Sequence, residues 1–126
     1  MKAWIPLLLV LTLGAASVAR ADCAYPAAPQ TPPDGNTATK EQMIAAQHDF
    51  VRYNTEMNTY LDCTSQQINE ATPKDASKLS ADEKKKVEEQ LKILTQKHNA
   101  AVDELQANVG RFNEQLKIFK AKNSKS

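Results

Sequence analysis

Two cysteines, Cys23 and Cys63, are the residues of this chain whose chemistry is easiest to define from the sequence. Neither belongs to a C-x-x-C motif, and no basic cluster flanks Cys63 that would lower the pKa of its thiol. The alternative of a redox or metal-binding thiol pair is therefore disfavoured. Because one intramolecular pairing is possible, we expect a structural disulfide between Cys23 and Cys63 in an oxidising compartment.

Two histidines, His48 and His98, are the candidate ligands for a metal ion. If two antiparallel helices pair with Glu70 opposite Ala81, His98 faces Tyr53, and the two imidazoles lie at neighbouring levels. Further side chains of the right type are Met43, Met57, Asp49 and Glu56. The sequence thus keeps a small metal-binding protein open as an alternative. The other interpretation is that His98 fixes the register of the helix pair and that the methionines belong to its core.

Catalytic motifs form the third kind of chemistry to consider. The chain has no G-x-S-x-G, no H-E-x-x-H and no glycine-rich phosphate loop. A thin helical protein also lacks room for a pocket that excludes water. We therefore expect no enzymatic activity, no catalytic residue and no cofactor.

The first 21 residues have the layout of a secretory signal peptide. A basic start at Lys2 precedes an apolar run over 5–13, and Ala19-Arg20-Ala21 matches an A-x-A cleavage site, so cleavage is expected before Asp22. The apolar run is well short of the ~20 residues of a membrane-spanning helix, which disfavours a membrane anchor. Lipidation at Cys23 is disfavoured too, because Asp22 stands where a small residue is needed. The sequence predicts export, to a periplasm or to the medium.

The charge of the remaining 105 residues is close to balanced. Removing Lys2 and Arg20 with the leader leaves 14 basic and 15 acidic side chains. A nucleic-acid-binding domain normally carries a clear basic excess, so nucleic acid is not an expected partner. The length indicates one domain.

Residues 22–38 form a proline-rich arm that leads into a helix. Its prolines are Pro26, Pro29, Pro32 and Pro33. The segment Pro33-Asp34-Gly35 is typical of a turn in which glycine takes a positive φ, and Thr39 with Gln42 forms a capping box. A polyproline arm reaching ~48 Å could run back along a helix of ~36 Å from about 39 to 63. Closing that loop would stabilise the fold by roughly 4 kcal/mol.

The arm, the turn at 33–35, the Met43–Ala46 helix start and the Tyr60–Cys63 segment together resemble a known pattern. They are similar to an uncharacterised group of small exported proteins of Gram-negative bacteria. The resemblance covers about residues 1–63. It implies no activity, ligand or site residue for this chain.

Two long amphipathic helices are expected, at about 40–70 and 81–121, with a disordered tail at 122–126. Ser80 and Glu83 form a second capping box. The second helix carries a coiled-coil-like seam of apolar residues with one polar interruption: Val87, Leu91, Leu94, His98, Val102, Leu105, Val109, Phe112, Leu116 and Phe119. A short connection favours an antiparallel hairpin. The predicted fold class is all-α, a two-helix hairpin with a disulfide-tethered arm.

The far end of the second helix supplies the main functional hypothesis. In the predicted register, residues 107–120 extend past the first helix and leave part of the seam uncovered. The residues concerned are Phe112, Leu116, Ile118 and Phe119. Such a stripe indicates helix-mediated contact with a protein partner or with a second copy. With Lys117 and Lys120 beside it, the same end could instead attach to an anionic membrane surface; the alternative is a solvated helix end whose lysines suit the helix dipole.

Overall fold

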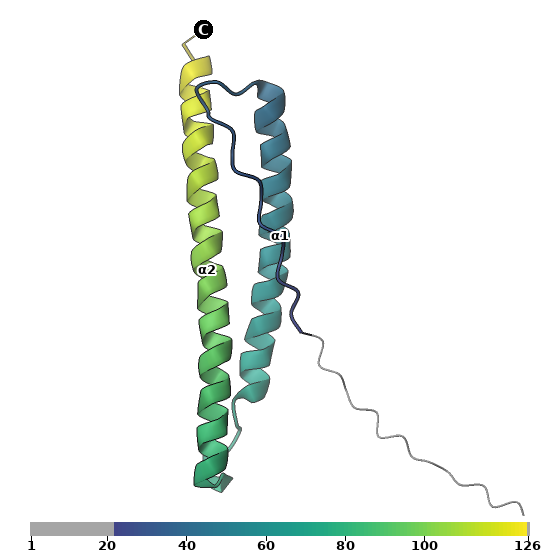
Figure 1. Cartoon of the computed structure of the whole chain (residues 1–126), viewed down its shortest axis with the longest axis vertical. Helices are drawn as coiled ribbons and strands as arrows, with labels where there is room; N and C mark the ends of the chain where they lie inside the picture. Colours follow the sequence, from purple (N-terminus) through teal and green to yellow (C-terminus); the bar gives the residue numbers. More distant parts are fainter. Residues whose placement is uncertain (1–21, 126) are drawn as a thin grey trace, which may run out of the picture.

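The computed structural model describes residues 22–125, so the predicted signal peptide lies outside the described residues. Two long helices, α1 at Lys40–Ala71 and α2 at Ala81–Asn123, pack side by side and antiparallel (Figure 1). A short 3₁₀ helix, η1 at Ala76–Lys78, lies in their connection. Residues 22–125 contain no strand. No helix among them is long and apolar enough to cross a membrane. The predicted all-α hairpin is confirmed.

Both helices start at the capping boxes that the sequence predicts. At α1 the Gln42 amide donates to Thr39 Oγ1 over 3.2 Å, and the Thr39 amide donates to Gln42 Oε1 over 2.8 Å. At α2 the same reciprocal bonds join Ser80 and Glu83, at 3.3 and 2.8 Å. Each pair satisfies two backbone donors that a helix start would otherwise leave without a partner.

The end of α2 differs from the prediction. The helix continues to Asn123 instead of ending at 121. Two side chains of the expected tail are engaged: Lys122 donates to the carbonyl of Asn36, and Asn123 donates to the carbonyl of Phe119 over 2.7 Å. The first bond joins the last helical turn to the turn that precedes α1, and the second lies within α2 itself.

The core is a narrow seam between the helices and the arm. Tyr53, Met57 and Ala101 are fully buried, and Tyr60 is 7% exposed. The half-buried side chains packed against this cluster are those of Cys23, Leu61 and Leu105. Burying a large apolar side chain stabilises a fold by about 1.5–3 kcal/mol. A few such residues therefore supply much of the stability.

The register of the hairpin differs from the predicted one. Thr64 lies against His98, and Tyr53 lies against Asn108. The residue numbers of two facing residues therefore add up to about 162, whereas the predicted pairing of Glu70 with Ala81 gives a sum of 151. The cause is the connection over 72–80, which runs past the end of α1 before α2 starts (Figure 1).

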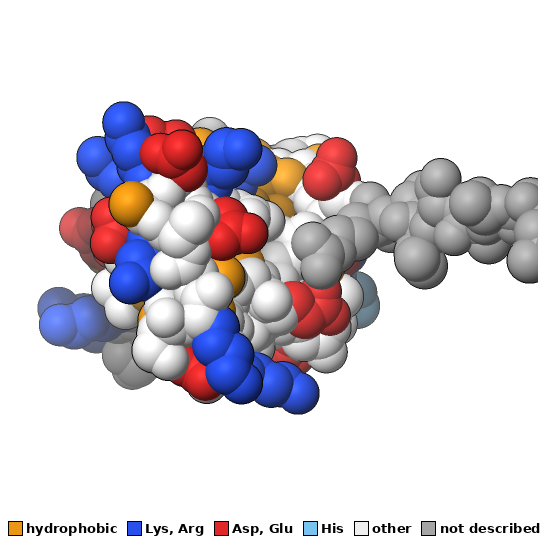
Figure 2. Space-filling view, turned by 90° about the horizontal axis from the view of Figure 1, so that it is seen from below, with side chains coloured by type: hydrophobic (Ala, Val, Ile, Leu, Met, Phe, Trp, Pro, Cys, Tyr) orange, Lys and Arg blue, Asp and Glu red, His pale blue; other side chains and the backbone are white. Residues whose placement is uncertain are grey.

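This register puts the overhang at the opposite end of α2. The first turns of α2 now extend beyond α1, and residues 82–86 are exposed. Seen from this end, basic and acidic side chains alternate over the surface with small apolar areas between them (Figure 2). The overhang is therefore a solvated, mixed-charge surface and not an apolar one.

The C-terminal part of α2 is covered instead of exposed. Phe112 is only 5% exposed, and Leu116, Ile118 and Phe119 are half-buried. The ring of Phe112 stacks on that of Phe50 of α1, with centroids 4.9 Å apart. The prediction of an uncovered apolar stripe at this end was wrong because it assumed that Glu70 lies opposite Ala81.

The turn at Asp34–Ala38 covers the same end of α2. The amides of Thr37 and Ala38 donate to the Asp34 carbonyl, over 3.1 and 2.8 Å. Gly35 does not have the positive φ that was expected. Its missing side chain matters for another reason. A Cβ there would lie 2.3 Å from the carbonyl oxygen of Gln115. Glycine is needed because the turn backbone touches the α2 backbone.

Candidate functional site

The predicted disulfide is confirmed and joins the start of the arm to the second half of α1. Cys23 and Cys63 are bonded, with their Cα atoms 5.7 Å apart, and 40 positions separate them in the sequence. From Cys23 the arm runs toward the start of α1, antiparallel to that helix and alongside α2 (Figure 1). The disulfide and the turn at 34–38 thus hold the arm at both ends.

The arm buries its prolines at regular intervals. Pro26 is buried, and Pro29 and Pro32 are half-buried. The residues between them, Ala27, Ala28, Gln30 and Thr31, are exposed. A polyproline II helix has three residues per turn, so prolines spaced by three lie on one edge of the chain. That edge faces the groove between α1 and α2.

Aromatic rings line the groove at two levels. Tyr25 packs edge-on against Tyr60, with ring centroids 4.8 Å apart. The stacked Phe50 and Phe112 lie further along the groove, next to Pro29 and Pro32. The space left there is about 10 Å³, lined chiefly by Pro29, Pro32, Ala46, Phe50, Asn108 and Phe112. The prolines therefore fill the groove.

Side chains of both helices bind the backbone or the tyrosine of the arm. The Gln30 amide donates to the Asp49 carboxylate over 2.7 Å, and the Gly35 amide donates to Gln115 Oε1 over 2.8 Å. The Tyr25 hydroxyl donates to Glu104 of α2. Because Pro has no N–H group, the arm presents few donors, and two of them are satisfied in this way.

A polar network lies beneath the arm at the same level. The Tyr53 hydroxyl donates to Glu104 over 3.2 Å and accepts from the Asn108 side chain over 3.1 Å. Arg111 donates to Asn108 Oδ1 over 2.7 Å. Burial raises the pKa of the Tyr53 phenol. Among the described residues, no buried side-chain polar atom lacks a partner. The network is a satisfied structural element.

Sequence reasoning missed this network. Its one signal was Asn108, a polar residue next to the seam residue Val109 of a helix whose apolar spacing is otherwise regular.

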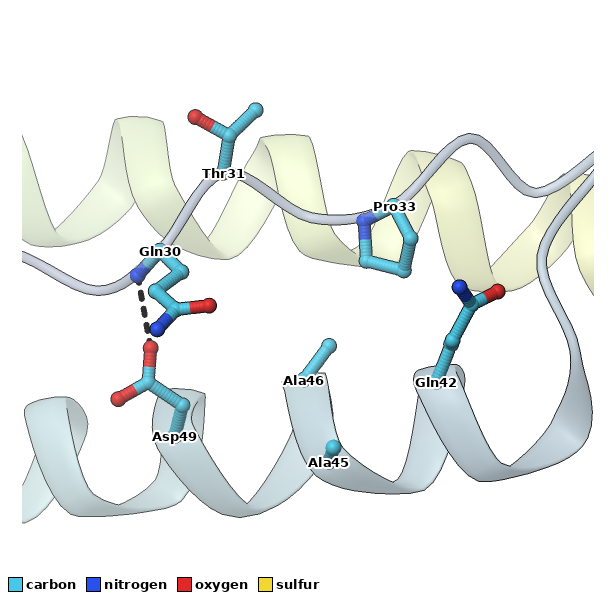
Figure 3. A pocket seen from close by; sticks show the side chains of 7 residues that line it. All are labelled: Gln30, Thr31, Pro33, Gln42, Ala45, Ala46 and Asp49. Atoms are coloured by element: carbon cyan, nitrogen blue, oxygen red, sulfur yellow. Dashed lines mark hydrogen bonds between the residues drawn. The ribbon is translucent and has the colours of Figure 1, made fainter.

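An open hollow of about 370 Å³ lies between the arm and α1 (Figure 3). Ala45 and Ala46 form its floor, and its rim is polar, with Gln30, Thr31, Pro33, Gln42 and Asp49. Hydrogen bonds from Arg52, and next from the Gln30 amide, hold the pKa of the Asp49 carboxyl below its ordinary value. The carboxylate is therefore engaged in holding the arm, and the hollow contains no activated nucleophile.

The structure does not bring the two histidines together. His98 Nδ1 lies 2.8 Å from the hydroxyl of buried Thr64, whereas His48 is exposed on α1. Thr64 and His48 are 16 positions apart on one helix, which corresponds to ~24 Å. Among residues 22–125 there is no group of three His, Cys, Asp or Glu side chains placed to hold a metal ion. The predicted juxtaposition of the imidazoles was wrong because the register differs.

The predicted contact residues at the end of α2 occupy two different environments. Phe112, Leu116 and Phe119 pack inward, while Lys117 and Lys120 are exposed. The lysines lie near the C-terminal end of the helix, where positive charge suits the dipole. Separated from the apolar residues, they do not form the amphipathic surface that was expected.

The outer face of α1 is the surface that sequence reasoning overlooked. Ile44 and Val51, one heptad apart, are 43% and 54% exposed. The Thr55 and Thr59 hydroxyls, at 2.9 and 3.1 Å, donate to carbonyls one turn back in the same helix. The sequence gives no sign of this exposure, because the apolar residues of α1 are spread too widely around the helix to show where its core face ends.

Two surfaces therefore carry the functional argument: the groove filled by the arm and the outer face of α1. Comparisons with protein-family models, with curated proteins and with solved structures find no match to this chain. The resemblance of residues 1–63 to a group of small exported proteins stays a prediction. The geometry of the two surfaces is what supports the proposals below.

Proposed function

We propose that this is an exported, non-enzymatic helical protein that acts through helix-mediated contact, and that the partner at the outer face of α1 is a second copy. The observation that carries the proposal is the exposure of Ile44 and Val51, at 43% and 54%, on the face of α1 opposite the core. An aliphatic pair one heptad apart is the repeat through which helices pack against each other.

The distribution of charge on this face favours a second copy. Lys40 lies four residues before Ile44, and Asp62 lies eleven residues after Val51, so all four share the face. In an antiparallel pair centred on Val51, Lys40 of each copy lies opposite Asp62 of the other, and Ile44 lies opposite Asn58. A two-fold contact is self-complementary, so the ion pair forms twice. Opposite charges at the two ends set the orientation and register of such a pair.

The polar side chains of this face can be buried in a contact at a low cost in free energy. Thr55, Asn58 and Thr59 already donate to backbone carbonyls of α1, at 2.9, 2.8 and 3.1 Å. Their donors therefore keep a partner when water is removed from the face. The area that one helix face can bury is small, so the contact belongs to the weak, reversible class of interfaces.

Export and the absence of catalysis rest on other observations. The pattern of residues 1–21 is typical of a secretory signal, and a disulfide persists in oxidising compartments such as the periplasm. The carboxylates of the groove and the hollow, Glu104 and Asp49, hold the arm. The signal pattern and the disulfide support the periplasm or the medium as the proposed site of action.

Cross-linking of single-cysteine additions tests the two-fold contact. Val51→Cys places a thiol at the proposed axis, and a short bismaleimide should join two copies. Ile93→Cys is the matched control, because Ile93 on α2 is also 54% exposed. We expect covalent dimer from Val51→Cys and essentially none from Ile93→Cys at the same concentration. Equal dimer yields from the two variants would overturn the proposal.

Charge reversal tests the orientation. Sedimentation equilibrium of Lys40→Glu or Asp62→Lys should show weaker self-association than the wild type, because each change puts like charges opposite each other. The double variant restores opposite charges and should recover the wild-type association. A double variant as weak as the sum of the single changes would contradict the antiparallel pairing.

A further inference from the structure

The groove between α1 and α2 holds an extended proline-rich segment as a peptide-binding site would. We propose that this groove is a binding site for polyproline segments, occupied in cis by residues 23–35 and open to a second proline-rich chain once the Cys23–Cys63 bond is broken. The ligand class is an extended segment with one aromatic residue followed by prolines three positions apart. This proposal does not depend on the outer face of α1.

The proline spacing of the arm matches the shape of the groove. Pro26, Pro29 and Pro32 face inward because their spacing equals one turn of a polyproline II helix. Aromatic-lined grooves commonly recognise such segments, because the ligand has little conformational freedom to lose on binding. Here Tyr60 and Phe112 supply the aromatic surface.

The prolines of the arm fill the groove almost completely. Only about 10 Å³ remains between Pro29, Pro32, Ala46 and the stacked Phe50 and Phe112. A cavity of that size is at the lower limit for a single water molecule. Ala46 is essential to this fit, because a larger side chain at the same position would enter the space of the prolines.

The anchor within the extended part of the arm binds backbone and not a particular side chain. Asp49 accepts from the Gln30 amide and Gln115 accepts from the Gly35 amide, at 2.7 and 2.8 Å. Any extended segment with an N–H group at the position of Gln30 satisfies Asp49, while Gly35 stays on Gln115 with the turn at 34–38. The exposed residues of the arm, such as Ala27 and Ala28, make no demand on the ligand. A segment from another chain with the same proline spacing therefore fits.

The disulfide controls access to the groove. An external dithiol reduces it by exchange: one thiolate attacks a sulfur of the bond, and the second thiol then closes the reductant into its own disulfide. Two electrons and two protons pass to the cysteines, which become the thiols of Cys23 and Cys63. The arm is then held only through the turn at 34–38, so its N-terminal part can leave and be replaced.

Disulfide trapping tests the site directly. The Cys23→Ser variant keeps the Cys63 thiol at the end of the groove, and the probe is a synthetic peptide of residues 22–35, whose single cysteine can join Cys63. In a glutathione redox buffer, mass spectrometry measures the mixed disulfide. A control peptide carries serine in place of the three inward prolines. We expect at least tenfold more trapping of the native peptide. Equal trapping of both peptides would overturn the proposal.

Two neighbouring alanines give a matched pair of protein variants in the Cys23→Ser background. Ala46→Leu fills the space under the prolines and should reduce trapping of the native peptide to the level of the control peptide. Ala45→Leu lies on the exposed side of the hollow and should leave it unchanged. Unchanged trapping by Ala46→Leu would mean that the peptide reaches Cys63 without the groove, and the proposal would fail.

A second measurement keeps the wild-type chain. A fluorescent peptide of residues 24–35 is added to the protein before and after reduction by a dithiol, and its polarisation is recorded. We expect a rise only after reduction, and only for the peptide with prolines. No rise, or an equal rise with the control peptide, would contradict the proposal even if the Cys23→Ser variant failed to fold.

Discussion

Replacing Gly35 by alanine should destabilise the protein through one contact between backbones. The new Cβ would lie 2.3 Å from the Gln115 carbonyl oxygen and 2.8 Å from the Phe119 nitrogen, both in the backbone of α2. A helix backbone does not yield, so the turn must move away. The cost combines overpacking, about 1–3 kcal/mol, with loss of the hydrogen bond from Gly35 to Gln115, about 1 kcal/mol. We expect Gly35→Ala to lower the free energy of unfolding by about 2–4 kcal/mol.

Gly110 provides the control within the same chain. Apart from its chain neighbours and the adjacent backbone of α2, nothing lies within 4 Å of a Cβ built at this position, and the residue is exposed. Alanine restricts the unfolded chain more than glycine, so Gly110→Ala should raise the free energy of unfolding by roughly 0.5–1 kcal/mol. Urea unfolding followed by circular dichroism at 222 nm measures both variants. If Gly35→Ala lies within about 0.5 kcal/mol of the wild type, the close approach of arm and helix is refuted.

Three further changes test the groove. Asp49→Asn should reduce the loss of stability below pH 4. Because the pKa of Asp49 is lowered in the fold, its carboxylate contributes stability above its ordinary pKa, and this contribution is lost as the pH falls. Urea unfolding from pH 2 to 6 measures the effect. Tyr25→Phe should reduce the loss of stability above pH 10. Burial, and next Glu104, raise the pKa of the Tyr25 phenol, so its contribution to stability disappears as the pH rises. If the wild type loses no more stability above pH 10 than the variant does, this expectation is contradicted. Phe112→Ala should cost about 3–5 kcal/mol, and a cost below about 1 kcal/mol in the same assay would show that its ring is not packed.

The features that the sequence predicts correctly are local or covalent. The capping boxes at Thr39 and Ser80 need residues only three positions apart, and their bonds are present. The disulfide followed from there being one possible pairing of Cys23 with Cys63. The fold class followed from the helical period of the apolar residues. In each case the determining residues can be read without knowing how the two helices face each other.

The register could not be read in the same way. A shift of about eleven residues is close to three helical turns, so the same faces still meet and the apolar pattern hardly changes. Specific pairs, His98 with Thr64 and Tyr53 with Asn108, fit only one register. The connection also contributes, because it contains η1, which Asp75 caps by accepting from the Ser77 amide over 3.1 Å, and is not a minimal turn between the helix ends.

The candidate site was missed for the same reason. With the register shifted, Phe112 lies buried in the groove and not in the predicted exposed stripe. Gly35 was correctly placed in a turn, but its role came from the proximity of α2, which no local pattern reveals. Residues whose role depends on how α2 faces α1 and the arm were therefore the ones that sequence reasoning assigned wrongly.

The claim on which the fold and the groove both depend is that the disulfide holds a docked arm. The most direct test compares the free energy of unfolding of the oxidised wild type with that of Cys23→Ser/Cys63→Ser, by urea titration at pH 7. Closing a loop of 40 residues stabilises a fold by about 4 kcal/mol in the chain-entropy model. We predict a loss of that size, with the helical circular dichroism retained in the absence of urea. A loss below about 1 kcal/mol would contradict a strapped, docked arm.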